Sequence, residues 1–173
     1  MPEPMFFCVL PAERSALVGT ILTTGGIPVL DFTASPRRDV PEGAWVRVRT
    51  RRSVPGTGPV ILTGSHKLPV RNRETWLEVT EPTAPPKGFA GVVLRGNEVG
   101  GAIGSEAGLA LLSKMGQDQK VILDAGLSPE QSASALAAGA TGVVLSDVLM
   151  GLEEVSLSAT FADKLERLDA SSF

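Results

Sequence analysis

Three loops that contain glycines, small residues or an acid hold the residues of this chain that could do chemistry. They span residues 95–104, 124–128 and 146–148. Each loop follows a short apolar run, and the first two precede a helical pattern, which is typical of strand–loop–helix units in a parallel β/α protein. Glycine lets backbone N–H groups approach a ligand closely, so such loops suit an anionic or planar ligand. We therefore expect the ligand face at these loops, although the pair Gly100-Gly101 is also explained by a tight strand-to-helix turn.

Two carboxylates are the candidates for acid/base chemistry. Asp124 ends a strand pattern, at the edge where β/α barrels place catalytic groups. Glu98 lies inside the first loop and could contact a bound ligand. A structural alternative stays open for each, because Asp124 could be a solvated strand end and Glu98 could cap a neighbouring loop amide. The same two interpretations apply to Asp31, which ends an earlier strand pattern.

The other reactive residue types indicate no site. The only histidine, His66, falls in a loop pattern, and the single Cys8 lies inside an apolar run, as a core residue would. No P-loop and no metal-ligand spacing occurs. A basic patch in the middle of the chain could meet a phosphate-bearing arm or an acidic partner, but a solvated alternating strand face also explains it. This patch consists of Arg47, Arg49, Arg51 and Arg52.

Eight apolar runs predict the strands that would position these loops. They are Met5–Leu10, Ile27–Phe32, Ala44–Arg49, Pro59–Thr63, Thr75–Val79, Ala90–Leu94, Val121–Leu123 and Gly142–Leu145. The run at Ala44–Arg49 alternates and predicts a half-exposed strand. Helical patterns follow the first, sixth, seventh and eighth runs, at 11–24, 104–115, 128–138 and 157–168. The third helix starts with Ser128-Pro-Glu-Gln131, a capping box with proline at the first helical position.

This order of elements predicts an α/β fold, most simply a truncated (β/α)8 TIM-barrel-like domain that lacks several outer helices. A full barrel takes about 250 residues, whereas this chain has 173. An open or mixed sheet is the alternative, since the topology of residues 36–87 is not determined by the patterns. Missing helices would leave apolar strand faces bare, and we expect a partner chain or a neighbouring domain to cover them.

Composition limits the classes of function. Hydrophobic residues make up 43% of the chain and charged residues 20%, which is typical of a globular domain rather than a disordered segment. The net charge of −3 gives no reason to expect binding to nucleic acid or to an anionic membrane. No apolar run approaches the roughly 18 residues of a membrane-spanning helix, and the amino-terminal residues have no secretory pattern. We expect a single cytoplasmic domain.

The segment Gly96-Asn-Glu-Val-Gly-Gly-Ala-Ile-Gly104 resembles the Gly-x-Glu-Ala-Gly-Gly-His-x-Gly motif of nitronate monooxygenases (2-nitropropane dioxygenases) and FMN-dependent enoyl reductases. It is more similar still to the nitronate-monooxygenase-like domain at the amino terminus of large bacterial polyketide and fatty-acid-type synthases. The likeness continues through Ala137–Leu145 to Leu165–Ser171, is weak over 1–35 and is absent over 36–87. It implies that residues 1–173 form one such domain, in the amino-terminal part of a larger synthase.

The resemblance also implies a flavin site on the same loops. Relatives hold the phosphate of FMN by backbone amides after the seventh and eighth strands. The matching positions here, with the glycine pair of the first loop, are Gly100, Gly101, Ala125, Gly126, Leu127, Ser128, Ser146 and Asp147. Three residues depart from the pattern: Ala125 replaces a loop glycine, Asp147 adds an anion, and Ala102 stands where the monooxygenases have their catalytic histidine.

Three functional hypotheses follow. The first is a catalytically degenerate barrel that serves as a scaffold or docking module, with a homodimer as one of its forms, within a polyketide or fatty-acid-type synthase. The second is an active FMN oxidoreductase that reduces an enoyl thioester or oxidises a nitronate, with Glu98 and Asp124 as its acid/base groups. The third is a non-redox module that binds phosphate or the phosphopantetheine arm of an acyl carrier. None of them requires a metal.

Overall fold

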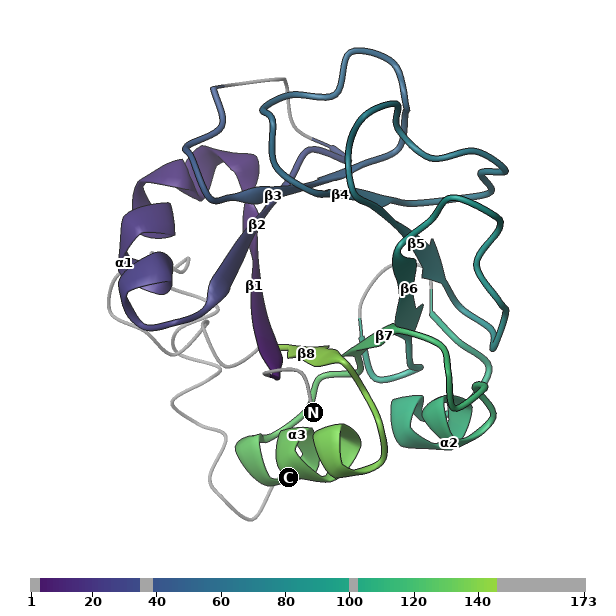
Figure 1. Ribbon diagram of the computed structural model, residues 1–173. Coiled ribbons are helices and arrows are strands. Elements are labelled where there is room, and N and C mark those ends of the chain that lie inside the picture. Colours follow the sequence, from purple (N-terminus) through teal and green to yellow (C-terminus); the bar gives the residue numbers. More distant parts are fainter. Residues whose placement is uncertain (1–3, 35–38, 100–102, 146–173) are drawn as a thin grey trace.

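The computed structural model describes residues 4–34, 39–99 and 103–145, and these form a closed barrel of eight parallel strands (Figure 1). Each strand pairs with the next along the chain, and the last pairs with the first. The predicted truncated (β/α)8 architecture is confirmed, and the alternative of an open or mixed sheet is wrong. The strands are β1 (Met5–Pro11), β2 (Ile27–Asp31), β3 (Trp45–Val48), β4 (Val60–Leu62), β5 (Thr75–Val79), β6 (Gly91–Arg95), β7 (Val121–Asp124) and β8 (Gly142–Val144).

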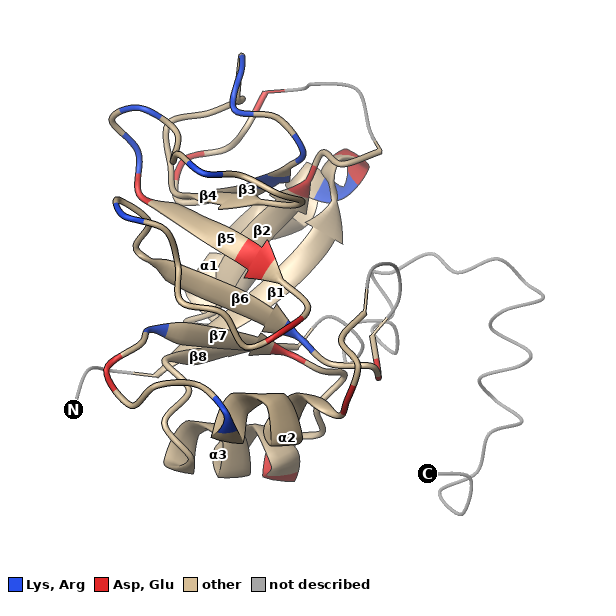
Figure 2. Ribbon diagram, turned by 90° about the vertical axis from the view of Figure 1, so that its right-hand side faces the viewer, with Lys and Arg blue, Asp and Glu red and all other residues tan. Residues whose placement is uncertain are grey.

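Helices follow only some of these strands. A 3₁₀ helix, η1 (Ala12–Leu17), and α1 (Val18–Thr23) follow β1, α2 (Gly108–Ser113) follows β6, and α3 (Pro129–Ala137) follows β7. The described residues between β2 and β6 contain no helix, as the sequence predicts. Seen from the side in Figure 2, α2 and α3 lie along one flank of the barrel, and irregular loops lie beyond β3 and β4 on the opposite flank. The helix predicted at 157–168 lies outside the described residues.

The predicted capping box at the start of α3 is confirmed. The Ser128 hydroxyl accepts a hydrogen bond from the backbone N–H of Gln131, and the Gln131 side chain accepts one from the backbone N–H of Ser128 at 2.9 Å. The helix ends before Gly139, which has a φ of +102°. The predicted helix over 104–115 is shorter than expected, because it begins only after Ala107, which adopts an extended backbone conformation.

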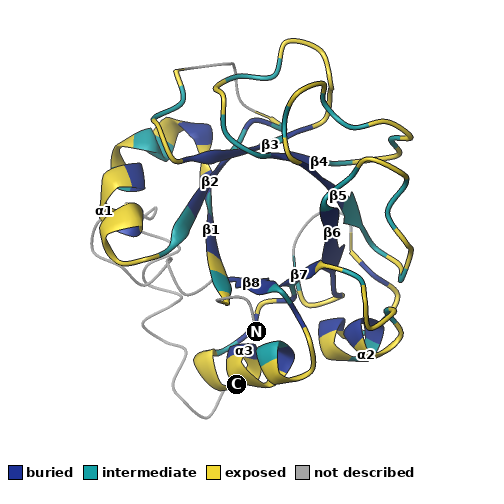
Figure 3. Ribbon diagram, viewed as in Figure 1, coloured by how far each residue is buried: buried dark blue, intermediate teal, exposed yellow. Residues whose placement is uncertain are grey.

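Apolar side chains fill the inside of the barrel. Alternate residues of each strand point inward, and Figure 3 shows the strands as the buried part of the molecule. The Trp45 ring meets the edge of Phe7 at 4.9 Å between ring centroids and lies 6.0 Å from Trp76. The inner cluster consists of Phe7, Val29, Trp45, Ile61, Trp76, Val93, Ile122 and Val144.

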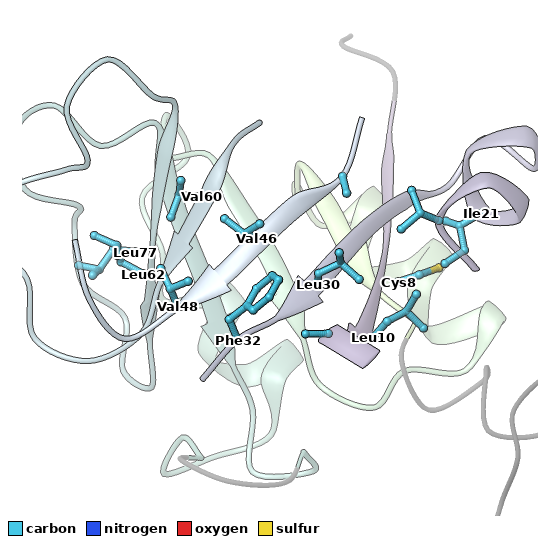
Figure 4. Close-up of a cluster of buried hydrophobic side chains, with 13 residues drawn as sticks. Cys8, Leu10, Ile21, Leu30, Phe32, Val46, Val48, Val60, Leu62 and Leu77 are labelled. Carbon is cyan, nitrogen blue, oxygen red and sulfur yellow. The ribbon is translucent and has the colours of Figure 1, made fainter. Parts of the chain in front are cut away.

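The outer faces of β3 and β4 are buried although no helix follows either strand. Val46, Val60 and Leu62 are fully buried, in a cluster that includes Phe32 and Leu77 (Figure 4). Apolar residues of the connecting loops pack against this cluster, and they are Val40, Val54, Val70 and Phe89. The expectation of bare strand faces that need a partner is therefore wrong for this part of the barrel, because each loop contributes an apolar side chain of its own.

The prediction of a half-exposed β3 is also wrong. Trp45 packs inside the barrel while Val46 and Val48 pack under the loops, so both faces of the strand are buried. Arg47 is the exception, and it points toward the open end of the barrel. A strand between a filled barrel and an outer layer is buried on both sides, so its alternation does not mark a solvated face.

Candidate functional site

Charged side chains from five strands meet at the carboxyl-terminal mouth of the barrel. We call them the mouth cluster, and they are Asp31 of β2, Arg47 of β3, Glu78 of β5, Arg95 of β6 and Asp124 of β7. The strand register places Asp31 beside Arg47 and Arg95 beside Asp124. This end of a (β/α)8 barrel is where enzymes with this fold place their functional groups.

Arg47 is held by two carboxylates. Its Nη1 donates to Asp31 Oδ2 at 2.6 Å, while Nε and Nη2 donate to the two carboxylate oxygens of Glu78 at 2.7 and 2.9 Å. Burial alone would lower the pKa of Arg47, but the hydrogen bonds and charges of Glu78 and Asp31 outweigh it and raise that pKa. Such a two-pronged arginine–carboxylate pair is geometrically specific and strong, so the Arg47 side chain is fixed in place.

Arg95 continues the chain of ion pairs to the other side of the mouth. Its Nε lies 3.1 Å from Asp124 Oδ2, and its Nη1 lies 3.6 Å from Glu78 Oε1. The side chains of Arg95 and Glu78 are only 8% and 7% exposed. Acids and arginines therefore alternate from Asp31 to Asp124, and the half-buried Arg47 and the buried Arg95 each contact two acids.

A small cavity lies against the mouth cluster. Its volume is about 170 Å³, below the roughly 300–1,000 Å³ that pockets for cofactors and drug-sized ligands usually have. Charged and apolar residues both line it. The charged ones are Arg47, Glu78, Arg95 and Asp124, and the apolar ones are Phe7, Val9, Ile61, Val93, Val99 and Val144.

The structure separates the two predicted acid/base residues. Asp124 belongs to the mouth cluster and lines the cavity. Glu98 does not line this cavity, and its carboxylate accepts hydrogen bonds from the backbone N–H of Gly108 at 3.1 Å to each oxygen. The amide-capping alternative for Glu98 is thus what the geometry supports, since this N–H belongs to the first residue of α2 and has no partner within the helix. The catalytic roles of both residues stay predictions.

Close packing explains several glycines around Glu98. A Cβ at Gly96 would overlap the Glu98 carboxylate and lie 2.7 Å from the backbone N of Gly108. A Cβ at Gly108 would overlap that of Ala125 on the neighbouring loop. These glycines let the first loop, α2 and the end of β7 approach one another, whether or not a ligand binds.

The loop between β7 and α3 does not fit the phosphate of FMN as it stands. The backbone N–H groups of Ser128 and Gln131 are already bonded within the capping box. The carboxylate of Glu130 accepts a hydrogen bond from the Ser128 hydroxyl at 2.8 Å. A hydrogen bond from its own backbone, followed by that from Ser128, lowers the pKa of Glu130, so an anion already stands at this helix start. A phosphate would have to displace these contacts and meet like charge.

The remaining residues predicted for this loop have separate roles. Ala125 and Leu127 are 2% and 5% exposed and belong to the core cluster under α2 and α3. Gly126 is exposed and has a φ of +59°, which favours glycine. The predicted site residues Gly100, Gly101, Ser146 and Asp147 lie outside the described residues, as does Ala102.

Sequence reasoning missed the centre of the mouth cluster. Arg47 was expected on a solvated face, which is wrong, and neither Glu78 nor Arg95 was singled out. One signal could have found them, because each is an even number of residues after an inward-facing apolar residue of its strand. These inward residues are Trp45, Trp76 and Val93.

The other reactive residues have local roles. Cys8 is buried on the outer face of β1, where burial raises the pKa of its thiol. His66 is half-buried, and its Nε2 lies 3.1 Å from the carbonyl oxygen of Thr63. Within residues 4–34, 39–99 and 103–145, no group of three or more His, Cys, Asp or Glu could hold a metal ion. The same ranges contain no helix long and apolar enough to cross a membrane.

Comparison with known proteins supports the fold and no more. No family model matches the chain, and no curated protein matches it. A solved structure of a mutant FabK from Thermotoga maritima is 15% identical, with a TM-score of 0.72 over 96% of this chain and 68% of that one. A native KDPGal structure is 12% identical, with a TM-score of 0.56 over 89% of this chain and 88% of that one. The chain is thus similar in fold to both, as a (β/α)8-type barrel with few outer helices.

Proposed function

We propose that this chain is a catalytically degenerate (β/α)8-type barrel that serves as a scaffold or docking domain. In this proposal, residues 1–173 form a single nitronate-monooxygenase-like domain in the amino-terminal part of a polyketide or fatty-acid-type synthase. The sequence likeness of the 96–104 loop and of the segment Ala137–Leu145 to nitronate-monooxygenase-like domains supports this family. The fold likeness to FabK supports the scaffold from which such a domain would derive.

The mouth cluster is the observation that carries this proposal. Arg47 and Arg95 tie together the acids of three other strands at the end of the barrel where chemistry would occur. A ligand that needed this space would have to separate buried ion pairs, and breaking one such pair costs about 3–5 kcal/mol. The capping box of α3 supports the same conclusion, because its N–H groups are already hydrogen-bonded where the phosphate of FMN would bind.

An FMN-dependent oxidoreductase, of the nitronate monooxygenase or enoyl-thioester reductase type, is the second candidate. The position of Asp124 favours it, because this carboxylate lines the mouth cavity at the end of β7. Bound FMN would supply the redox chemistry. The β7–α3 loop would first have to open its capping box, so the site residues of this candidate include Gly126 and Ser128.

Visible absorption of the purified protein separates the two candidates. We expect no flavin band, and no band after incubation with excess FMN followed by desalting. A second readout is the melting temperature with and without FMN, since a ligand at 100 times its Kd stabilises the fold by about 2.7 kcal/mol. A retained flavin spectrum, together with a raised melting temperature, would move the oxidoreductase to first place.

A further inference from the structure

The positive charge of this acidic protein is concentrated in one stretch. Residues 43–73 hold seven of the 16 lysines and arginines and none of the 19 aspartates and glutamates. Two of the seven are used internally: Arg47 in the mouth cluster, and Arg73, which donates to the carbonyls of Pro55 and Gly58. The other five are exposed. The chain therefore has a locally positive surface although its net charge is −3.

These five cations lie on two neighbouring loops. We call them, with Leu68, the basic loop surface: Arg49, Arg51 and Arg52 between β3 and β4, and Lys67, Leu68 and Arg71 between β4 and β5. Figure 2 shows lysine and arginine gathered on the loops beyond β3 and β4, with acidic residues more frequent toward α2 and α3. Arg49, Arg51, Lys67 and Arg71 make no ion pair with the described residues.

An exposed apolar side chain lies on the same loop as two of these cations. Leu68 is 57% exposed, more than any other large hydrophobic residue in the described ranges. Its sequence neighbour Lys67 is also exposed, and Arg71 follows three positions later. An exposed apolar residue with a charged surround is the composition of a protein docking surface, where the apolar contact adds affinity and the charges select the partner.

The two loops hold this surface on a fixed backbone. Arg73 bridges them, because it leaves the β4–β5 loop and donates to two carbonyls of the β3–β4 loop. Val54 and Val70 anchor the same loops in the core cluster beneath. The only non-glycine residues with positive φ in the described ranges, Ser53 at +51° and Asn72 at +57°, are also here. A surface organised before binding loses less entropy when a partner docks.

We infer that the basic loop surface docks a carboxylate-rich protein surface that offers an apolar contact to Leu68. Nucleic acid fits less well, because proteins that bind single strands stack bases on aromatic side chains, and residues 49–59 and 63–74 contain no Phe, Trp or Tyr. The inference rests on the proposed docking role and names the surface that this role would use.

Two synthetic helical peptides of equal negative charge provide the probes. One carries glutamates with leucines on one face, and the other has alanine at each leucine position. Binding is followed by fluorescence anisotropy of a dye on each peptide. We expect the leucine peptide to bind more tightly, and Leu68→Ala to abolish the difference between the two. Both affinities should fall as salt rises from about 0.01 M to about 0.1 M, where the Debye length shortens from about 30 Å to about 10 Å.

Charge-reversal variants locate the binding surface. The triple variant Arg49→Glu, Arg51→Glu, Lys67→Glu should weaken binding of the leucine peptide by about tenfold or more. The matched control is Lys114→Glu, Lys120→Glu on the side of α2 and β7, which should change it by less than about twofold. Circular dichroism and melting temperature establish that each variant is folded.

Four outcomes would overturn the inference: no binding of either peptide, equal losses in the triple variant and in its control, tighter binding of a DNA duplex than of the peptides, or displacement of both peptides by inorganic phosphate alone. The third outcome would indicate a nucleic-acid surface, and the fourth a simple anion site. The flavin experiment is independent of all four, because FMN retention would refute the degenerate barrel while leaving the basic loop surface to be judged on these data.

Discussion

The two flanks of this barrel bury similar strands beneath different outer layers. On one flank, Val92 and Leu94 of β6 lie under α2, and both are fully buried. On the other, Val46 of β3 and Val60 of β4 lie under loops and are buried to the same extent. A (β/α)8 barrel therefore does not need a helix over every strand. It needs an outer layer that excludes water from the apolar face.

The two flanks differ in how the backbone N–H and C=O groups of each outer layer find hydrogen-bond partners. A helix pairs its N–H and C=O groups internally and needs partners only at its ends. A loop must find a partner for each buried group, and here the Arg73 side chain supplies partners for the Pro55 and Gly58 carbonyls. We therefore expect the loop-covered flank to depend on single polar side chains, and the helix-covered flank to depend on apolar packing.

Removal of Glu78 should have the largest effect, because this residue connects the two flanks. Glu78→Ala leaves Arg47 and Arg95 without their shared acid, and we expect a loss of about 3–5 kcal/mol in the free energy of unfolding. Urea denaturation measures it. Glu42→Ala, at an exposed position, is the control and should cost less than about 0.5 kcal/mol. If both variants lost equally little, the mouth cluster would not hold the flanks together.

Truncation of Leu111 tests the helix-covered flank. This side chain of α2 is fully buried, so Leu111→Ala should cost about 2–5 kcal/mol through lost burial and the cavity that remains. The loop counterpart, Val70→Ala, removes a half-buried side chain and should cost about 1 kcal/mol. Urea denaturation of both variants gives the comparison, and a larger loss for Val70→Ala would reverse the proposed difference between the flanks.

Replacement of Arg73 tests the loop-covered flank. Arg73→Met keeps much of the side-chain length but removes the donors to Gly58 and Pro55, and we expect a loss of about 1–3 kcal/mol. Amide hydrogen exchange should accelerate over residues 49–59 and 63–74 while α2 and α3 stay protected. Exchange that accelerated equally on both flanks would contradict the idea that Arg73 acts on its own loops.

The smallest effect should come from acid titration at the start of α3. Hydrogen bonds from its own backbone and from Ser128 lower the pKa of Glu130 in the folded state. Its contribution to stability is therefore present above the ordinary glutamate pKa of about 4.3, and it is lost as the pH falls through the lower folded-state value. The difference in urea midpoint between the wild type and Glu130→Gln should shrink toward acidic pH. A difference that grew instead would mean that the assigned sign is wrong.

Local patterns predicted the parts of the fold that depend on neighbours in the chain. The residues Ser128-Pro129-Glu130-Gln131 can form a capping box with no distant contact, and α3 starts there. Apolar runs of strand length likewise marked all eight strands, with boundaries that differ by at most one residue. Gly96 lies in the predicted loop and Gly108 in the predicted helix over 104–115, but only the structure shows that packing against Glu98 and Ala125 requires them.

The amino-acid order alone was enough to determine the strand count, the flanks that carry helices and the acid at the end of β7, because periodicity and capping act over a few residues. Closure of the barrel determined which side chains meet at its mouth. It joined Asp31 to Asp124 through arginines on other strands, and it turned Arg47 from an expected surface residue into the centre of the mouth cluster. The reason is physical: an alternating strand has two equivalent faces in the sequence, and only packing on both sides determines which face meets the lumen and which meets the loops.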